Sequence, residues 1–193
     1  SAGQGEGSFV IPAGFTTNAQ IKLVVEDIYD NTGEGFGDYF TVTDNTPPIV
    51  VIDTPDTMSI GETISLTWTA SDNNSIEKHK LYYAVSVNQT FTFIDSVDGN
   101  AISYNWLVPN VVTDSARIGI ETYDSVNLST ADTSTYFVII DEIIPTIEVL
   151  VPAEGYTIPE YGDLTASWTA SDNIALDSIR AYYSNDSGTS FSW

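Results

Sequence analysis

The sequence predicts an all-β protein built from seven-stranded antiparallel β-sandwich domains that repeat in tandem. Two observations lead to this prediction. Short runs of alternating apolar and polar residues recur about every 8–12 residues, separated by Gly, Asn, Asp, Ser and Pro. Long stretches of the sequence also return at a fixed spacing, which is the signature of a repeated unit.

The repeat is visible in two registers. The six residues 68–73, Trp-Thr-Ala-Ser-Asp-Asn, return unchanged at 168–173, which is 100 residues later. In the second register, 97 residues apart, residues 9–12 correspond to 106–109. We therefore divide the chain into the C-terminal half of one repeat, a complete repeat and the N-terminal half of another, at residues 1–46, 47–144 and 145–193.

The complete repeat is expected to contain seven strands, at residues 49–53, 61–70, 79–85, 90–95, 101–106, 116–122 and 135–140. In the second of them, Ile64, Leu66, Trp68 and Ala70 alternate with Thr and Ser. This alternation is typical of an antiparallel strand with one buried face. We therefore expect Trp68, and Trp168 in the other copy, to be almost wholly buried between two sheets.

Several features of the unit resemble those of immunoglobulin-like, fibronectin type III-like and cadherin-like domains, which are strung in tandem in bacterial surface and secreted proteins. The residues that carry the resemblance are the Pro-flanked start at 44–48, Trp68 before Ser71-Asp72-Asn73, Tyr82-Tyr83, Val108-Pro109 and the loop at 124–127. The resemblance implies an extracellular or cell-surface structural role, as a filament, stalk or adhesin extender.

The resemblance also leaves open an alternative function, that of an accessory module of a secreted hydrolase. Such a module could bind carbohydrate, because Tyr82, Tyr182 and Trp193 could form a sugar-stacking strip. Aromatic residues on outward strand positions also pair across strands, which is the structural alternative. No motif indicates what the protein binds at its distal end.

The charge of the chain limits its partners. There are 27 acidic residues and 5 Lys and Arg, for a net charge of -22. Such a surface repels phosphate backbones and anionic lipids, so we expect no nucleic acid partner, and it attracts cations. No apolar run approaches ~18 residues, so we expect no membrane insertion.

Acidic and amide side chains are predicted to meet where one repeat joins the next. In a sandwich of this type, the incoming linker and the loops after the second and sixth strands converge at one pole. At the first junction these segments hold Asp44, Asn45, Asp72, Asn73, Asp124 and Asn127. The second junction has Asp141, Glu142, Asp172 and Asn173. Ca²⁺ takes six to eight oxygen ligands, so we predict Ca²⁺ sites here. The alternative is metal-free turns, which Asp and Asn also favour.

The sequence offers little for catalysis, and we predict that the chain is not an enzyme. His79 is the only histidine and its counterpart is Ile179, so His79 is expected to pack in the core. Cysteine and a Gly-rich phosphate loop are absent. Residues 184–191 resemble an Asp-box turn, in which Asp186 is expected to fold back on the loop amides as a turn stabiliser.

The two half repeats are each expected to leave a core face open. The exposed residues would be Ile21, Leu23 and Val25 at one end, and Leu164, Ala166 and Trp168 at the other. We expect copies of the chain, or adjacent repeats of a longer polypeptide, to cover these faces head-to-tail as an extended rod. Ser1, in place of an initiating Met, favours a longer polypeptide.

Overall fold

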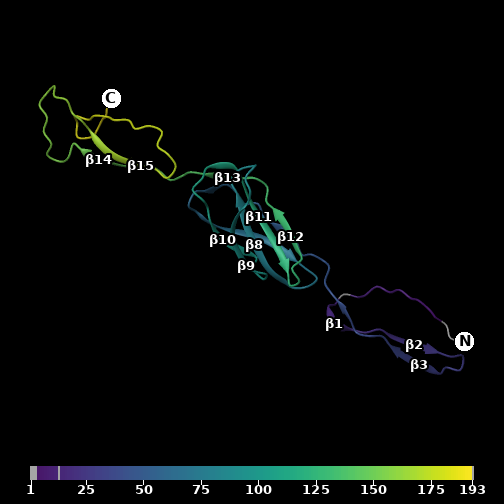
Figure 1. The fold of residues 1–193 in the computed structure, drawn as a ribbon. Helices are drawn as coiled ribbons and strands as arrows, with labels where there is room; N and C mark the ends of the chain where they lie inside the picture. Colours follow the sequence, from purple (N-terminus) through teal and green to yellow (C-terminus); the bar gives the residue numbers. More distant parts are fainter. Residues whose placement is uncertain (1–3, 13, 193) are drawn as a thin grey trace.

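The structure is a computed structural model that describes residues 4–12 and 14–192, and it is all-β (Figure 1). Within these residues there is no helix, and hence none long and apolar enough to cross a membrane. Ser1 and Trp193 lie outside the described residues. Three groups of strands follow one another along the chain: an N-terminal segment (β1–β4), a central segment (β5–β13) and a C-terminal segment (β14 and β15).

The central segment contains two sheets. One has three antiparallel strands in the order β10 (Ser103–Leu107), β7 (Thr63–Ser71) and β5 (Ile49–Ile52). The other has the order β6 (Met58–Ser59), β13 (Phe137–Ile140), β11 (Thr113–Asp124), β8 (Ile76–Ala84) and β9 (Thr92–Asp98). The sixth strand of this sheet, β12 (Ser129–Thr133), also pairs with β11. The β6–β13 pair is parallel and the other pairs are antiparallel.

Both sheets contribute to one hydrophobic core. The three-stranded sheet provides Val50, Ile52, Leu66, Trp68 and Trp106, and the other sheet provides Met58, Leu81, Ile118, Ile120, Phe137 and Ile139. Along β11 every second residue from Ala116 to Asp124 is buried, as expected for a strand with one face on the core. The predicted inward positions of Leu66, Trp68, Ile118 and Ile120 are confirmed.

Two strands were not predicted from the sequence. The strand β12 has the sequence Ser-Thr-Ala-Asp-Thr, which lacks an apolar alternation because it lies at an edge and pairs with β11 through its backbone. The strand β6 is only two residues long. In addition, β9 begins later than predicted and continues to Asp98, which pairs with Lys78 of β8.

The N-terminal segment forms two small antiparallel sheets. The strand β1 (Thr16–Ala19) pairs with β4 (Phe40–Val42), and β2 (Lys22–Glu26) pairs with β3 (Thr32–Phe36). Both ladders have the register of central ladders that lie 97 residues later. The matching pairs are Thr16 opposite Val42 with Thr113 opposite Ile139, and Lys22 opposite Phe36 with Gly119 opposite Thr133.

The C-terminal segment contains one ladder, between β14 (Thr146–Val151) and β15 (Ser167–Ser171). Its register matches the β5–β7 ladder of the central segment. Val149 lies opposite Trp168 as Ile52 lies opposite Trp68, and the Ala170 pair likewise matches the Ala70 pair. The end segments therefore have the local strand pairing of the central segment.

Burial differs sharply between these matching strands. Trp168 is 42% exposed, whereas Trp68 is 3% exposed. The prediction that Trp168 is buried is therefore wrong, because the C-terminal segment has no second sheet over this face among its described residues. The expectation of open faces holds for Leu23, Val25 and Leu164, which are also exposed.

Candidate metal site between the N-terminal and central segments

Three carboxylates converge where the N-terminal segment joins the central one. Asp44 lies in the linker between β4 and β5, Asp72 follows the end of β7, and Asp124 is the last residue of β11. Each contributes an oxygen atom to a group in which all three atoms lie within 4.8 Å of one another. This group could hold a metal ion. The linker and both loops are those expected from the sequence.

Local hydrogen bonds orient each of the three carboxylates. The Thr46 backbone amide donates to Asp44 Oδ1 at 3.0 Å, and the Asn74 amide donates to Asp72 Oδ2 at 2.9 Å. Asp124 Oδ1 accepts from the backbone amides of Val126 and Leu128, at 2.9 and 2.8 Å. These are the turns that Asp favours because its short side chain reaches the backbone two residues on.

The other oxygen of each carboxylate is buried and has no hydrogen-bond partner among the described residues. These atoms are Asp44 Oδ2, Asp72 Oδ1 and Asp124 Oδ2. The whole Asp124 side chain is buried, with 0% of its surface exposed. A buried carboxylate oxygen without a donor is destabilising. A bound cation would remove this cost, and Ca²⁺ prefers carboxylate oxygens.

The protein supplies little positive charge to this group. Hydrogen bonds from the Thr46 amide and the Asn73 side chain hold the pKa of Asp44 below its usual value against the effect of burial, so Asp44 is ionised at neutral pH. In the described part of the chain, the one ion pair within 4.0 Å joins Lys22 to Glu34. Three neighbouring carboxylates therefore repel one another with no Lys or Arg paired to them.

The amide residues predicted at this junction have supporting contacts. Asn73 Nδ2 donates to Asp44 Oδ1 at 3.2 Å and ties the β7–β8 loop to the linker. Asn127 has a positive φ of 67°, and its backbone amide donates to Asp124 O at 3.3 Å. The backbone amide of Asn45 adds a minor hydrogen bond to Asp44.

The second junction repeats part of this arrangement. Asn173 Nδ2 donates to Asp141 Oδ1 at 3.2 Å, as Asn73 does to Asp44, and the Ile174 amide donates to Asp172 Oδ2 at 3.0 Å. Glu142 instead accepts a hydrogen bond from Ser59 Oγ at 2.5 Å. Within the described residues, only the first junction brings three carboxylates together.

Asn110 is a junction residue that the sequence analysis missed. Its side chain donates to Asn173 O at 2.7 Å and accepts from Asn173 Nδ2 at 3.0 Å. The sequence feature that could have identified Asn110 is its position in the turn directly after Val108-Pro109. These two bonds attach the C-terminal segment to the central one.

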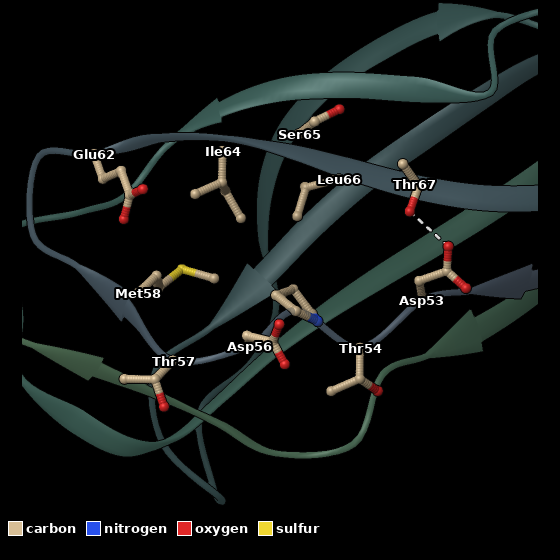
Figure 2. A pocket seen from close by; sticks show the side chains of 11 residues that line it. Asp53, Thr54, Asp56, Thr57, Met58, Glu62, Ile64, Ser65, Leu66 and Thr67 are labelled. Carbon is tan, nitrogen blue, oxygen red and sulfur yellow. Dashed lines mark hydrogen bonds between the residues drawn. The ribbon is translucent and has the colours of Figure 1, made fainter.

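A separate surface pocket of about 370 Å³ lies beside β5, β6 and β7 (Figure 2). Asp53, Asp56 and Glu62 line it together with Met58 and Leu66. Figure 2 shows Asp53 bonded to Thr67, whose Oγ1 donates to Asp53 Oδ2 at 2.5 Å. Glu62 accepts a long hydrogen bond of 3.3 Å from the Ser59 amide. Two of the three carboxylates thus have structural partners.

His79 packs in the core of the central segment, as predicted. It has 0% exposure, its Nδ1 bonds Thr122 Oγ1 at 2.8 Å, and its ring meets Trp68 edge-on at a centroid distance of 5.3 Å. Burial lowers the pKa of His79, partly offset by a hydrogen bond to Gly99 O and by Asp98. The neutral His79 ring therefore stabilises the contact between the two sheets.

The hairpin at residues 184–191 has the expected Asp-centred turn. Asp186 Oδ1 accepts from the Ser190 amide at 2.9 Å and from Ser184 Oγ at 2.7 Å. These bonds, with Ser190 Oγ contributing most, lower the pKa of Asp186 to about 2. Phe191 remains 65% exposed. The side chain of Asp186 is thus occupied by its own turn.

The aromatic residues of the predicted sugar-binding strip occupy different segments. Tyr82 packs edge-on against Phe93 and donates to Glu121 Oε2 at 3.3 Å, which is the cross-strand pairing of a sheet face. Tyr182 lies in the C-terminal segment and is half exposed. Carbohydrate binding stays a prediction.

A scan against protein-family models finds no match for the chain, and a search of curated proteins finds none either.

Proposed function

We propose that the chain is part of an extracellular rod of tandem immunoglobulin-like sandwich repeats, in which Ca²⁺ bound by Asp44, Asp72 and Asp124 fixes the angle between successive repeats. Such a rod serves as a stalk, filament or adhesin extender. The observation that carries this proposal is the set of three buried, unpartnered carboxylate oxygens at the point where two segments meet.

Matching strand ladders support the tandem arrangement. The N-terminal ladders have the registers of β11–β13 and β11–β12, and the C-terminal ladder has the register of β5–β7. In the central segment, two sheets share one core that includes Trp68, as in a sandwich of the immunoglobulin type. Figure 1 shows the three groups of strands arranged one after another, which suits a spacer.

Calcium is the cation that best fits this group. The three donors are hard carboxylate oxygens from separate loops, and Ca²⁺ completes its six to eight ligands with backbone carbonyls and water. The net charge of -22 raises the local concentration of cations. Since Asp44 belongs to the linker while Asp72 and Asp124 belong to the central segment, an ion bound by all three would restrict the hinge between them.

Calorimetric titration of the metal-free chain with Ca²⁺ tests the proposal. We expect one saturable site of this type in the native chain, and its loss in Asp124→Asn and Asp72→Asn. The matched control is Asp56→Asn, which removes the same charge from the surface pocket and should leave binding unchanged. The absence of binding heat in the native chain, together with unchanged melting after chelation, would overturn the calcium site.

A further inference from the structure

The few positively charged side chains of this acidic protein share one face of the repeat. Lys78 and Lys80 on β8 and Arg117 on β11 alternate with buried residues, so they point outward from the six-stranded sheet. The other two cations lie in the end segments. Lys22 corresponds to an outward position of β11, and Arg180 corresponds to Lys80. We call the outward surface around Lys78, Lys80 and Arg117 the cationic face.

The two lysines of the cationic face share one tyrosine ring. The Nζ atoms of Lys78 and Lys80 lie 5.2 and 4.6 Å from the ring centroid of Tyr123, a favourable cation–π distance. Glu121 lies opposite Lys80 on β11, but it accepts a hydrogen bond of 3.3 Å from the Tyr82 hydroxyl instead. Neither ammonium group lies within 4.0 Å of a carboxylate oxygen of the described residues.

The guanidinium of Arg117 lies between two aromatic rings. Its central carbon is 5.2 Å from the ring centroid of Phe91 and 5.1 Å from that of Tyr136. Phe91 packs over Gly119, where an added Cβ atom would approach the ring to 3.2 Å. Within the described residues, the guanidinium donates one hydrogen bond, from Nη2 to Val87 O at 3.2 Å. Arg117 is thus held in place by rings and a carbonyl, with no carboxylate paired to it.

The cationic face differs in charge from the rest of the protein. At the outward positions of β8, β9, β11 and β12, the acidic residues are Asp98 and Glu121. Asp98 accepts hydrogen bonds of 2.9 Å from the amide and the side chain of Asn100. By contrast, three carboxylates line the pocket beside β5, β6 and β7 (Figure 2). In a chain with a net charge of -22, an anion is therefore repelled least at the cationic face.

We propose that the cationic face binds a polysaccharide that carries carboxylate groups, such as a polymer of uronic acid. The lysines and Arg117 provide charge-assisted hydrogen bonds to the carboxylates. Phe91, Phe93 and Tyr136 are exposed beside them, and their rings can pack against the C–H groups of sugar rings. This inference goes beyond the rod proposed above, because it assigns the rod a ligand that binds along its side.

The arrangement of the rings favours a glycan over an acidic polypeptide. An acidic peptide needs only the cations, whereas a charged sugar needs a cation and an exposed ring side by side. Each of the three cations lies within 6 Å of an aromatic ring. The exposed Phe93 extends this surface, because it packs edge-on against Tyr82 at a centroid distance of 5.7 Å.

Binding of the complete chain to immobilised polygalacturonate tests the proposal. Chelator is present throughout, so that Ca²⁺ cannot bridge the acidic protein to the acidic polymer. We expect saturable binding that weakens as NaCl is raised, because salt screens charge pairs. Methyl-esterified polygalacturonate keeps the sugar rings without the charge, and polyglutamate keeps the charge without the rings. Both should bind more weakly. No binding of polygalacturonate, or equal binding of either matched polymer, would overturn the proposal.

Variants of the cationic face locate the binding site. Lys78→Gln combined with Lys80→Gln should lower the affinity about tenfold or more, because bonds to charged groups are strong. Lys80→Arg is the matched control, since it keeps the charge and has the residue of the other copy, Arg180. Glu121→Gln should tighten binding by removing a repulsive charge. A merely structural role of the lysines would not produce that gain.

Thermal melting of each variant separates lost binding from lost folding. A double lysine variant that melts like the native chain and binds polygalacturonate equally well would overturn the site. If the double variant melts earlier, Glu121→Gln decides, and unchanged affinity in that variant would overturn the site. A chain that binds Ca²⁺ through Asp124 but does not bind polygalacturonate contradicts the cationic face alone. The reverse result contradicts the calcium site alone.

Discussion

Trp68 and Trp168 occupy the same position in the same six-residue motif, yet their surroundings differ. Trp68 is 3% exposed and contacts His79, while Trp168 is 42% exposed. Each lies in a ladder of the same register, opposite Ile52 in one case and Val149 in the other. The motif thus determines strand pairing, whereas burial depends on the presence of the second sheet, which contains β8 and β11.

The same contrast applies to the acidic loops. The linker and the loop after the tryptophan strand have matching hydrogen bonds at both junctions, through Asn73 and Asn173. Among the described residues, only the first junction has a third carboxylate, Asp124, which comes from a third loop. The linker and one loop are enough to orient their carboxylates. The end of β11 is needed to bring the third carboxylate, Asp124, to them.

The largest expected effect separates the two tryptophans. Trp68→Ala should lower the free energy of unfolding of the central segment by ~3–5 kcal/mol, because it leaves a cavity between the sheets. Trp168→Ala should cost much less in a dilute sample, where that face is open. Urea denaturation followed by circular dichroism measures both. A loss under ~1 kcal/mol for Trp68→Ala would contradict the core described here.

The second effect distinguishes the two junctions. Calcium at 100 times its dissociation constant should stabilise the native chain by about 2.7 kcal/mol through binding linkage. Asp124→Asn should abolish the calcium-dependent rise in melting temperature, while Asp172→Asn should retain it in dilute solution. Differential scanning calorimetry with Ca²⁺ and with chelator makes the comparison. Equal losses in the two variants would show that the first junction is not the principal site.

The third effect concerns His79 and its counterpart Ile179. Since burial lowers the pKa of His79 in the folded state, the unfolded chain binds the proton more readily. The contribution of His79 is therefore complete above the unfolded value of about 6.5 and is lost as pH falls below it. Denaturation between about pH 5 and 7.5 should show this decline. His79→Ile should flatten it, and an unchanged slope in that variant would contradict the role of His79.

The smallest effect concerns the hairpin at residues 184–191. Asp186 has a folded pKa of about 2, below its ordinary value of 3.8, so the turn keeps its full stabilisation above 3.8 and loses it as pH falls through about 2. Carboxyl chemical shifts in an NMR titration should give this midpoint. In Ser190→Ala the midpoint should rise toward 3.8, since Ser190 Oγ is the main donor. Stability of the central segment should not change.

Most of the central strands could be predicted from sequence because their alternation reports one buried face. This was so for β7 and for the predicted inward residues Ile118 and Ile120 of β11. The strand β12 escaped because an exposed edge strand needs only backbone partners. The burial of Trp168 was mispredicted because a side-chain pattern does not show whether a second sheet is present.

The loops that form the candidate site could be predicted from the sequence, but the individual residues that contribute to it were predicted less well. Asp44, Asp72 and Asp124 converge as expected because a strand order of this kind brings their loops to one pole. Glu142 is the residue next to Asp141, but its side chain reaches Ser59. Asn110 was missed because its contact with Asn173 depends on how two segments meet.

The most direct test of the calcium junction is a crystal structure of the chain grown with Ca²⁺, with anomalous difference maps to locate the ion. We expect a strong peak at the first junction, about 2.3–2.6 Å from Asp44 Oδ2, Asp72 Oδ1 and Asp124 Oδ2. The same three oxygens bound to water or to protein donors, with no anomalous peak between them, would contradict the account.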